Sequence, residues 1–397
     1  MFYNIKDILR EVKALKIPSD YWHIPVEDVL THDFTILLSI REDAGKTTQS
    51  LLFGLVLYKL YGTTTEYLRN DKTQVTRGKI ETLYKTVREH NYISRCFNDK
   101  YNDVEYSPIV KKFFLIKRDA DGIIIDRDTE PLCVVHSTEE AESFKSSYNN
   151  PHGDYIVLDE FMDSHRASYN LWIDLMTCIS TIGRPGSRGR EDRVFCIMLG
   201  NNTNEYSQWF DDFCISDKIP DLKYGGVIRW ETALGTTGTC RLLEVSERQK
   251  EKIKQKRVRF FGFPTKKAAQ FIGTAEWSGK SYPHPKERMD YDNKIYSRLY
   301  VFHRDRYIQL ELFKYESGYQ VLAHFSRPPL LEDNIIMTLF PEKKCEVYGY
   351  GQYQNNKKIK KVIDVYFKLK NENRWLFASN MVGELVEDFQ KNINKVS

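Results

Sequence analysis

The stretch of residues 33–61 constrains the fold more strongly than any other part of the chain. It begins with an apolar run, Phe34 to Ile40, that has the composition of a buried strand, and it continues into an apolar helix from Thr48. The polar loop between the two ends in Ala44, Gly45, Lys46 and Thr47. A buried strand, such a loop and a helix are the layout of a phosphate-binding loop, in which backbone N–H groups surround the phosphates.

The last residues of this loop are the predicted nucleotide contacts. The Lys46 ammonium would neutralise charge on the β- and γ-phosphates, and the Thr47 hydroxyl would reach Mg²⁺. The predicted backbone contacts are Ala44, Gly45 and Thr48. The loop departs from the usual pattern, because Ile40 replaces the first glycine and residues 41–43 are charged rather than glycine-rich.

A second apolar run, residues 154–160, ends in two adjacent acids. Asp159 at the end of a strand can hold Mg²⁺ together with the Thr47 hydroxyl, and Glu160 can polarise an attacking water. The alternative is that both carboxylates only solvate a turn. The occurrence of the acid pair together with the loop favours a site for nucleotide hydrolysis.

Two further groups are candidates for the same site. Asn201 and Asn202 follow an apolar strand and could sense the γ-phosphate or position water, although an ordinary asparagine turn is the alternative. Arginines lie in the glycine-containing segment between residues 182 and 193, at Arg184, Arg188 and Arg190. They suit an arginine finger that reaches a neighbouring subunit, and they suit contacts to a DNA backbone nearly as well.

The order of apolar segments predicts an α/β fold with a mostly parallel sheet and covering helices. We expect a P-loop ATPase domain over residues 1–206, a small lid over 207–240, a basic linker over 241–258 and a strand-rich α+β domain over 259–397. Within the last domain, residues 362–367 have the β-branched and aromatic content of a strand. A closing helix is predicted from Met381 to about Asn392.

Composition and charge exclude several classes of protein. With 397 residues, 41% of them hydrophobic, the chain can bury a full core, and we expect two domains. Its seven cysteines form no Cys-x-x-Cys pair, which argues against structural zinc and favours reduced thiols inside a cell. The longest apolar run, residues 51–58, is too short to span a membrane. We therefore expect a cytoplasmic protein.

The net charge of +4 does not by itself indicate a nucleic-acid-binding protein. Basic residues nevertheless crowd residues 248–259 and 357–361. Each cluster could contact phosphates, and a solvated surface is equally compatible with each cluster taken alone.

The ordered set of motifs resembles the DNA-packaging ATPases, or encapsidation proteins, of phi29-type phages, within the larger group of terminase-like packaging motors. The matching segments are Phe2-Tyr3-Asn4, Gly45-Lys46-Thr47, Tyr67-Leu68-Arg69, Lys145-Ser146, Ile156 to Phe161, the arginine-rich loop and Cys196 to Asn201. They cover the first half of the chain. Beyond about residue 240 only Ser246-Glu247-Arg248 and the strand-rich pattern are similar.

The resemblance implies a homo-oligomeric ring, commonly a pentamer, at the portal of a procapsid in the host cytoplasm. Such a ring drives double-stranded DNA inward by ATP hydrolysis, in some members with a packaging RNA as a further partner. It implies that Lys46 and Thr47 bind ATP and Mg²⁺, with Asp159 on the metal and Glu160 as the catalytic carboxylate. The basic residues implied to act across the subunit boundary are Lys145, Arg184 as first choice for the finger, and Arg190 as second. For Lys145 an ordinary surface lysine remains the alternative.

In large terminases the corresponding C-terminal domain is an RNase-H-like nuclease, which needs acids on adjacent strands. Here the predicted strand 296–303 contains no acid, Asp305 follows it, and Glu311 and Asp364 are lone acids of the kind that usually face solvent. We therefore expect a degenerate domain that binds DNA, RNA or portal without cutting. The alternatives are a nuclease-competent terminase and a different P-loop ATPase, such as a helicase or a partition protein.

Overall fold

The structure of the chain is a computed structural model. It describes residues 3–18, 21–39, 45–147, 150, 152–162, 168–183, 194–201, 207–244, 251, 282–285, 295–315, 318–329, 334–339, 346–347 and 355–393. The chain divides into two compact units, Met1–Ser278 and Gly279–Ser397. Most of the predicted basic linker, residues 241–258, lies outside the described residues.

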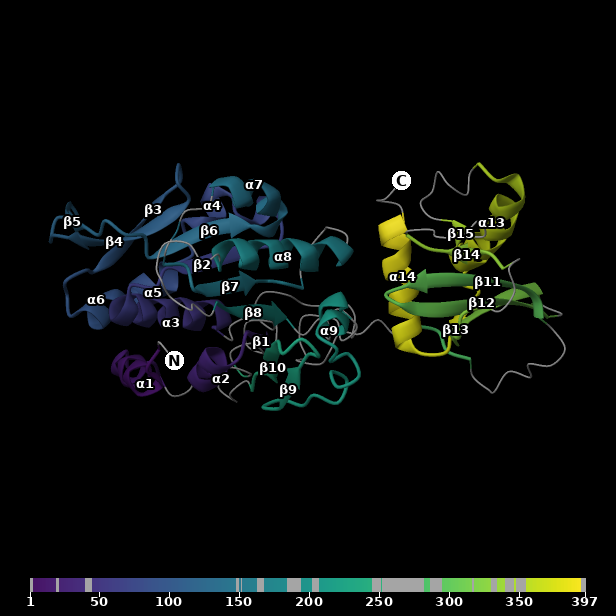
Figure 1. Cartoon of the computed structure of the whole chain (residues 1–397), viewed down its shortest axis with the longest axis horizontal. Helices are drawn as coiled ribbons and strands as arrows, with labels where there is room; N and C mark the ends of the chain where they lie inside the picture. The colour runs from purple at the N-terminus through teal and green to yellow at the C-terminus, as the bar shows by residue number, and fades with distance from the viewer. Residues whose placement is uncertain are drawn as a thin grey trace. The chain divides into compact units, whose positions relative to one another are not determined.

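The first unit is built on a ten-stranded sheet with the order β3-β4-β6-β2-β7-β8-β1-β10-β9, and β5 pairs with β4 beside this path. The parallel strands of its centre are β6 (Cys133–Ser137), β2 (Thr65–Arg69), β7 (Tyr155–Asp159), β8 (Phe195–Asn201), β1 (Phe34–Ser39) and β10 (Thr237–Leu242). Antiparallel strands complete both edges: β3 (Asp103–Ser107), β4 (Lys112–Arg118), β5 (Ile124–Arg127) and β9 (Val227–Glu231). In Figure 1 the strands from β6 to β9 follow one another down the unit, and the predicted mostly parallel sheet is confirmed.

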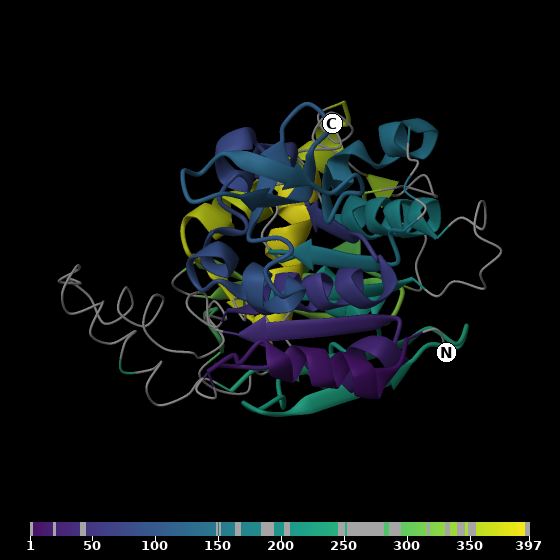
Figure 2. The same ribbon diagram turned by 90° about the vertical axis from the view of Figure 1, so that its left-hand side faces the viewer.

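Helices cover this sheet. They are α1 (Ile5–Ala14), α2 (Val26–Thr31), α3 (Lys46–Tyr61), α4 (Arg77–Ile80), α5 (Lys85–Glu89), α6 (Tyr92–Phe97), α7 (Ala141–Ser147), α8 (Ser168–Ile182) and α9 (Gln208–Asp212). Short 3₁₀ turns occur at Lys72–Gln74 and Thr138–Glu140. In Figure 2 the N-terminal helices (purple) lie at the same edge of the unit as teal strand segments. A hydrogen bond joins these parts of the chain, because Asp28 of α2 accepts from Arg241 of β10 at 2.5 Å.

Two hydrophobic clusters show that the sheet is buried on both faces. Leu37 of β1 packs in the cluster that contains α3, whereas Ile36 and Leu38 pack in the cluster that contains α8. This division follows from the alternation of side chains along a strand. A strand that is buried on both faces needs a continuous apolar sequence, and this explains why β1 could be identified as a strand.

Two local features complete the edges of this sheet. A hairpin turn that contains Asp121 and Gly122 joins β4 to β5, with Gly122 in the left-handed region at φ +81°. Within the range 207–240, where the sequence predicted a lid, β9 lies at the edge of the sheet and β10, which starts in this range, pairs in parallel with β1.

The second unit contains a six-stranded sheet with the order β15-β14-β11-β12-β13-β16. Its strands are β11 (Ile295–His303), β12 (Arg306–Tyr315), β13 (Gly318–Ser326), β14 (Ile336–Met337), β15 (Glu346–Val347) and β16 (Trp375–Phe377), and its helices are α13 (Lys357–Asn371) and α14 (Asn380–Ile393). Strands β11, β12 and β13 are antiparallel, while β14, β15 and β16 add in parallel at the two sides. The strand-rich domain and the closing helix are therefore confirmed.

The predicted strand at residues 362–367 is wrong, because this segment lies inside α13. The Asn356 side chain accepts hydrogen bonds from the first backbone N–H groups of the helix, which defines its start. Ile363, Tyr366 and Leu369 are its buried residues, at the three-residue spacing of one helix face. Packing of this face overrides the β propensity of the segment.

Among the described residues, no helix has both the length and the apolar composition needed to cross a membrane.

Candidate functional site

Most of the predicted site residues that the structure describes come together where parallel strands of the first sheet end. Ser39 at the end of β1 is paired in register with Asn201 at the end of β8, and Asp159 ends the neighbouring strand β7. Helix α3 begins beside them at Lys46, after Gly45 in the left-handed conformation at φ +70°. The carboxyl edge of a parallel sheet is the usual ligand position in such folds.

Lys46 is directed toward these strand ends. Its ammonium donates hydrogen bonds to Ser39 Oγ at 2.5 Å and to Asn201 Oδ1 at 3.3 Å. Asn201 is buried and so belongs to the floor of the site. The cation is thereby held at the N-terminal end of a 16-residue helix, where a phosphate is favoured by the helix dipole.

Thr47 and Asp159 meet across the same edge. The Thr47 hydroxyl donates a 2.9 Å hydrogen bond to Asp159 Oδ2, which joins the first turn of α3 to the end of β7. A hydroxyl and a carboxylate are oxygen donors of the kind that Mg²⁺ prefers. Thr48 follows on the same turn and is half-buried.

These residues fit a magnesium ion that is shared with a nucleotide. Among the described residues, no group of three or more histidine, cysteine or acidic side chains is placed to hold a metal by itself. Magnesium typically binds through one or two carboxylates together with water and substrate phosphates. Thr47 and Asp159 have the oxygen atoms that the protein part of such a set would need.

Asp159 is also bound by two residues of strand β2 to which sequence analysis gave no role in the site. The Tyr67 hydroxyl donates to Asp159 Oδ2 at 2.6 Å, and Arg69 Nη2 donates to the same atom at 3.0 Å. Arg69 Nε in addition donates to the Tyr67 hydroxyl at 2.9 Å. Both residues belong to the Tyr67-Leu68-Arg69 motif, one of those on which the resemblance rests. The presence of polar side chains in an otherwise apolar strand could have indicated that they take part in the site.

Glu160 follows Asp159 in an unusual backbone conformation. Its φ of +54° lies in the left-handed region, which costs energy for a residue other than glycine. Its N–H donates to Asp159 Oδ1 at 3.0 Å, and its carboxylate forms an ion pair with Arg69. Asn70 Nδ2 donates to the carbonyl of Phe161 at 2.7 Å and supports the turn from β2.

The charges at this edge are coupled. Burial, followed by the negative charge of Asp159, raises the pKa of Tyr67 well above its ordinary value, so the hydroxyl keeps its proton. Burial disfavours the charged form of Arg69. The nearby Asp159 carboxylate, together with Tyr67 and Glu160, has the larger combined effect and raises the pKa of Arg69. Arg69 is therefore a permanent cation between two carboxylates.

Five of the predicted site residues lie outside the described residues. They are Ala44, Arg184, Arg188, Arg190 and Asn202. Lys145 is placed on α7, where it forms a surface ion pair with Glu142 at 2.8 Å.

The three acids considered for a nuclease site lie on different elements of the second unit, and among the described residues no group of three or more acids, histidines or cysteines could hold a metal ion. Asp305 lies in the turn after β11, Asp364 is exposed on helix α13, and Glu311 lies on β12. The expectation that Glu311 faces solvent is wrong, because this side chain is 5% exposed and pairs with Arg298 and His324 at 3.4 Å each. The Arg298 cation, together with His324 when it is protonated, compensates the cost of burying this charge.

Comparisons with known proteins identify the fold. No protein-family model matches the sequence, and comparison with curated proteins gave no match. A structure described as the phi-28 gp11 DNA packaging motor has a TM-score of 0.58 and 18% identity, covering 95% of this chain and 99% of that chain. The bacteriophage phi-29 viral genome packaging motor assembly has a TM-score of 0.56 and 15% identity, covering 95% of this chain and 100% of that chain. The chain therefore has the fold of these two phage packaging-motor proteins, in agreement with the resemblance of its motifs.

Proposed function

We propose that this chain is an ATPase that drives double-stranded viral DNA into a procapsid. One observation carries the proposal: Lys46, Thr47, Asp159 and Glu160 gather at the carboxyl edge of one parallel sheet. Residues far apart in the sequence thereby supply three groups: the Lys46 ammonium for the phosphates, the Thr47 and Asp159 pair for a metal ion, and the Glu160 carboxylate next to them. The DNA-packaging part of the proposal is supported by the two fold relatives, which are packaging motors.

In this proposal each residue acts on ATP at a defined position. Lys46 binds the β- and γ-phosphates, while Gly45 and Thr48 contribute backbone N–H groups at the start of α3. Thr47 and Asp159 hold Mg²⁺, which would supply positive charge beside the phosphates. Ala44 is proposed to join these backbone contacts.

Glu160 is the proposed catalytic carboxylate. It orients a water whose oxygen attacks the γ-phosphorus, and it accepts the proton as the bond to the ADP oxygen breaks, which yields ADP and phosphate. Asn201 lies beside Lys46 and is the proposed amide that contacts the γ-phosphate or the water. Arg69 forms an ion pair with Glu160 Oε2 and so orients the carboxylate that would bind the water.

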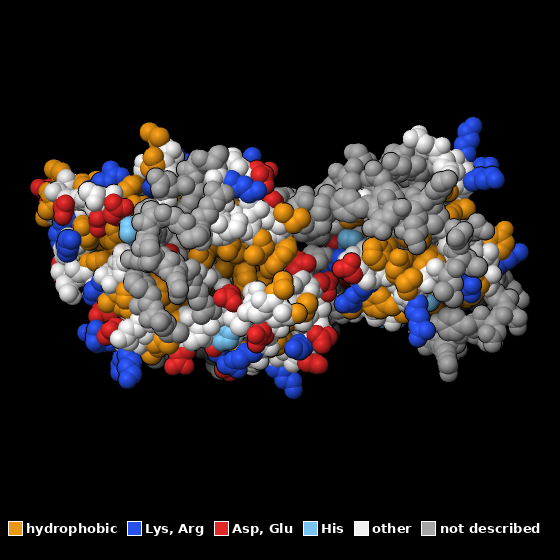
Figure 3. Space-filling model, in the orientation of Figure 1, with side chains coloured by type: hydrophobic (Ala, Val, Ile, Leu, Met, Phe, Trp, Pro, Cys, Tyr) orange, Lys and Arg blue, Asp and Glu red, His pale blue; other side chains and the backbone are white. Residues whose placement is uncertain are grey.

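The proposed assembly is a ring, most simply a pentamer, at the portal of a procapsid in the host cytoplasm, with a packaging RNA as a further partner. Arg184, with Arg190 as second choice, and Lys145 are proposed to reach the nucleotide of a neighbouring subunit. The basic residues 357–361 begin helix α13 and are mostly exposed, and basic side chains project near this helix in Figure 3. They are proposed to contact nucleic-acid phosphates.

The test is ATP hydrolysis by the purified chain with and without double-stranded DNA, followed by nuclease protection of DNA in the presence of procapsids. We expect hydrolysis that DNA stimulates, and protected DNA only when ATP and procapsids are both present. An absence of magnesium-dependent ATP binding would contradict the nucleotide site. ATP hydrolysis without any protection of DNA would contradict the packaging function, while the assignment as an ATPase would still hold.

A further inference from the structure

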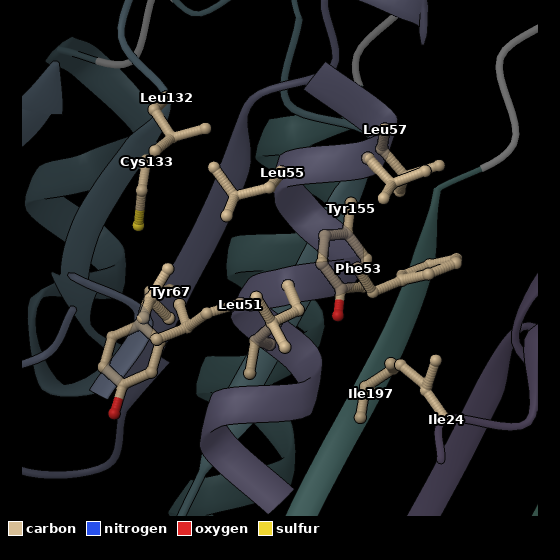
Figure 4. Packing of buried hydrophobic residues seen from close by; sticks show 14 of the residues in the cluster. Ile24, Leu51, Phe53, Leu55, Leu57, Tyr67, Leu132, Cys133, Tyr155 and Ile197 are labelled. Atoms are coloured by element: carbon tan, nitrogen blue, oxygen red, sulfur yellow. The ribbon is translucent and has the colours of Figure 1, made fainter. Parts of the chain in front are cut away.

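Tyr67 is a buried tyrosine whose hydroxyl is part of the site. It lies on β2 opposite Val157 of β7, and its side chain is 0% exposed. Its ring packs in the hydrophobic cluster around α3, and Figure 4 shows its hydroxyl turned away from Leu132 and Cys133. The hydroxyl reaches Asp159 Oδ2 at the end of β7 at 2.6 Å.

Asp159 Oδ2 accepts three hydrogen bonds, which is more than its two lone pairs can accept in good geometry. Thr47 donates to it at 2.9 Å, Tyr67 at 2.6 Å and Arg69 at 3.0 Å. A carboxylate has about two acceptor directions on each oxygen. The binding of a cation to this oxygen therefore requires at least one of these donors to withdraw, whereas Oδ1 accepts the Glu160 N–H.

The three donors differ in their freedom to withdraw. Thr47 lies on the first turn of α3 and is partly exposed, and Arg69 is a long side chain that also bonds Glu160. The Tyr67 ring is enclosed in the core, and its hydroxyl accepts a hydrogen bond from Arg69 Nε at 2.9 Å while donating to Asp159. Tyr67 is thus the donor whose position the fold determines.

We propose that Tyr67 is a positioning residue that fixes the Asp159 carboxylate for the divalent cation bound with the nucleotide. This inference rests on the proposed nucleotide site and goes beyond it by assigning a residue that sets the affinity for the cation. The physical reason is that a metal-binding carboxylate is oriented by the groups that hydrogen-bond to it. Loss of such a partner typically weakens metal binding about 10- to 100-fold.

The test is Tyr67→Phe, which keeps the ring and removes only the hydroxyl. Binding of a fluorescent ATP analogue to the full chain is titrated with Mg²⁺, and Mn²⁺ bound in the presence of ATP is measured by electron paramagnetic resonance. We expect the half-saturating concentration of either cation to rise at least about tenfold. Affinity for the analogue without a cation should stay within about twofold, because Tyr67 contacts Asp159 and not Lys46.

Tyr155→Phe is the matched control. Tyr155 is equally buried, on the neighbouring strand β7, but its hydroxyl donates to the backbone carbonyl of Ser50 at 3.0 Å. Figure 4 shows both tyrosines in the same cluster. The control should lose similar thermal stability and keep the cation dependence of the unmodified chain.

Further outcomes decide the proposal. In an Asp159→Asn chain, Tyr67→Phe should cause no additional shift, because its effect passes through the carboxylate. Unchanged cation dependence in Tyr67→Phe, an equal shift in Tyr155→Phe, an additive double variant, or unfolding confined to Tyr67→Phe would each contradict the positioning role. If the unmodified chain bound no analogue at any Mg²⁺ concentration, the proposed nucleotide site itself would be wrong.

Discussion

Arg69 forms an ion pair with Glu160, so a guanidinium from strand β2 holds the carboxylate that directly follows the neighbouring strand β7. The same guanidinium bonds Asp159, and the two acids therefore share one cation. The arrangement compensates two adjacent negative charges, one on the buried Asp159 and one on the half-exposed Glu160. Arg69 also orients the Glu160 side chain, which is the proposed catalytic carboxylate.

Removal of this cation should lower stability. Arg69→Ala leaves Asp159, a buried carboxylate, without its charged partner, and we expect a loss of about 3 kcal/mol in the free energy of unfolding. Chemical denaturation of the full chain measures this loss. Arg77→Ala is the control, because Arg77 pairs with Glu81 on the surface and its loss should change stability little. Equal stability of the two variants would show that Arg69 is not needed to compensate Asp159.

Lys46→Ala should abolish turnover and leave the fold intact. The lysine contacts two polar side chains at the site, and its replacement removes charge-assisted contacts to phosphate. We expect nucleotide affinity to fall at least about tenfold with little change in melting temperature. Lys59→Ala, in the same helix but paired with Glu11, is the control that should bind nucleotide normally. Unchanged ATP hydrolysis in Lys46→Ala would show that the proposed phosphate-binding loop takes no part in the reaction.

Glu160→Gln should bind ATP and fail to hydrolyse it. The amide keeps the shape of the side chain but accepts no proton, so turnover should fall by about 10²- to 10⁴-fold. Rapid-quench measurement of one turnover separates this loss from product release. Normal turnover in this variant would mean that the base lies elsewhere.

If an arginine acts across the subunit boundary, two inactive chains should complement each other. Mixtures of Arg184→Ala and Glu160→Gln chains should recover part of the turnover, because some interfaces then combine an intact Arg184 with an intact Glu160. The measurement is ATP hydrolysis as a function of the mixing ratio, with Arg190→Ala tested in parallel. Recovery at no ratio would favour an arginine that acts within its own subunit.

The second unit should respond to pH through His324. Its contact with the Glu311 carboxylate raises the pKa of His324 against the opposing effect of burial. A group whose pKa is raised by folding stabilises the native state below its unfolded pKa of about 6.5, and the contribution is lost as the pH rises through the folded pKa. Histidine-selective NMR titration of the full chain should give a pKa above 6.5 for His324, and Glu311→Gln should return it toward that value. A pKa unaffected by Glu311→Gln would contradict the ion pair.

The sequence by itself determined the local parts of this protein. The apolar runs of β1 and β7, the Gly45-Lys46-Thr47 ending and the acids after β7 are visible because each depends on residues close together in the chain. A parallel sheet followed from the alternation of such runs with helices. The motifs also indicated the packaging-motor fold that the two solved structures share.

Only the tertiary structure decided which strands are neighbours and which side chains meet. Pairing of β2 with β7 brings Tyr67 and Arg69 to Asp159 across about 90 residues of chain, as the separations of 92 and 90 positions show. Packing likewise made residues 362–367 part of a helix and buried Glu311 beside Arg298 and His324. The physical reason is that strand order and burial arise from long-range contacts, which local propensity does not contain.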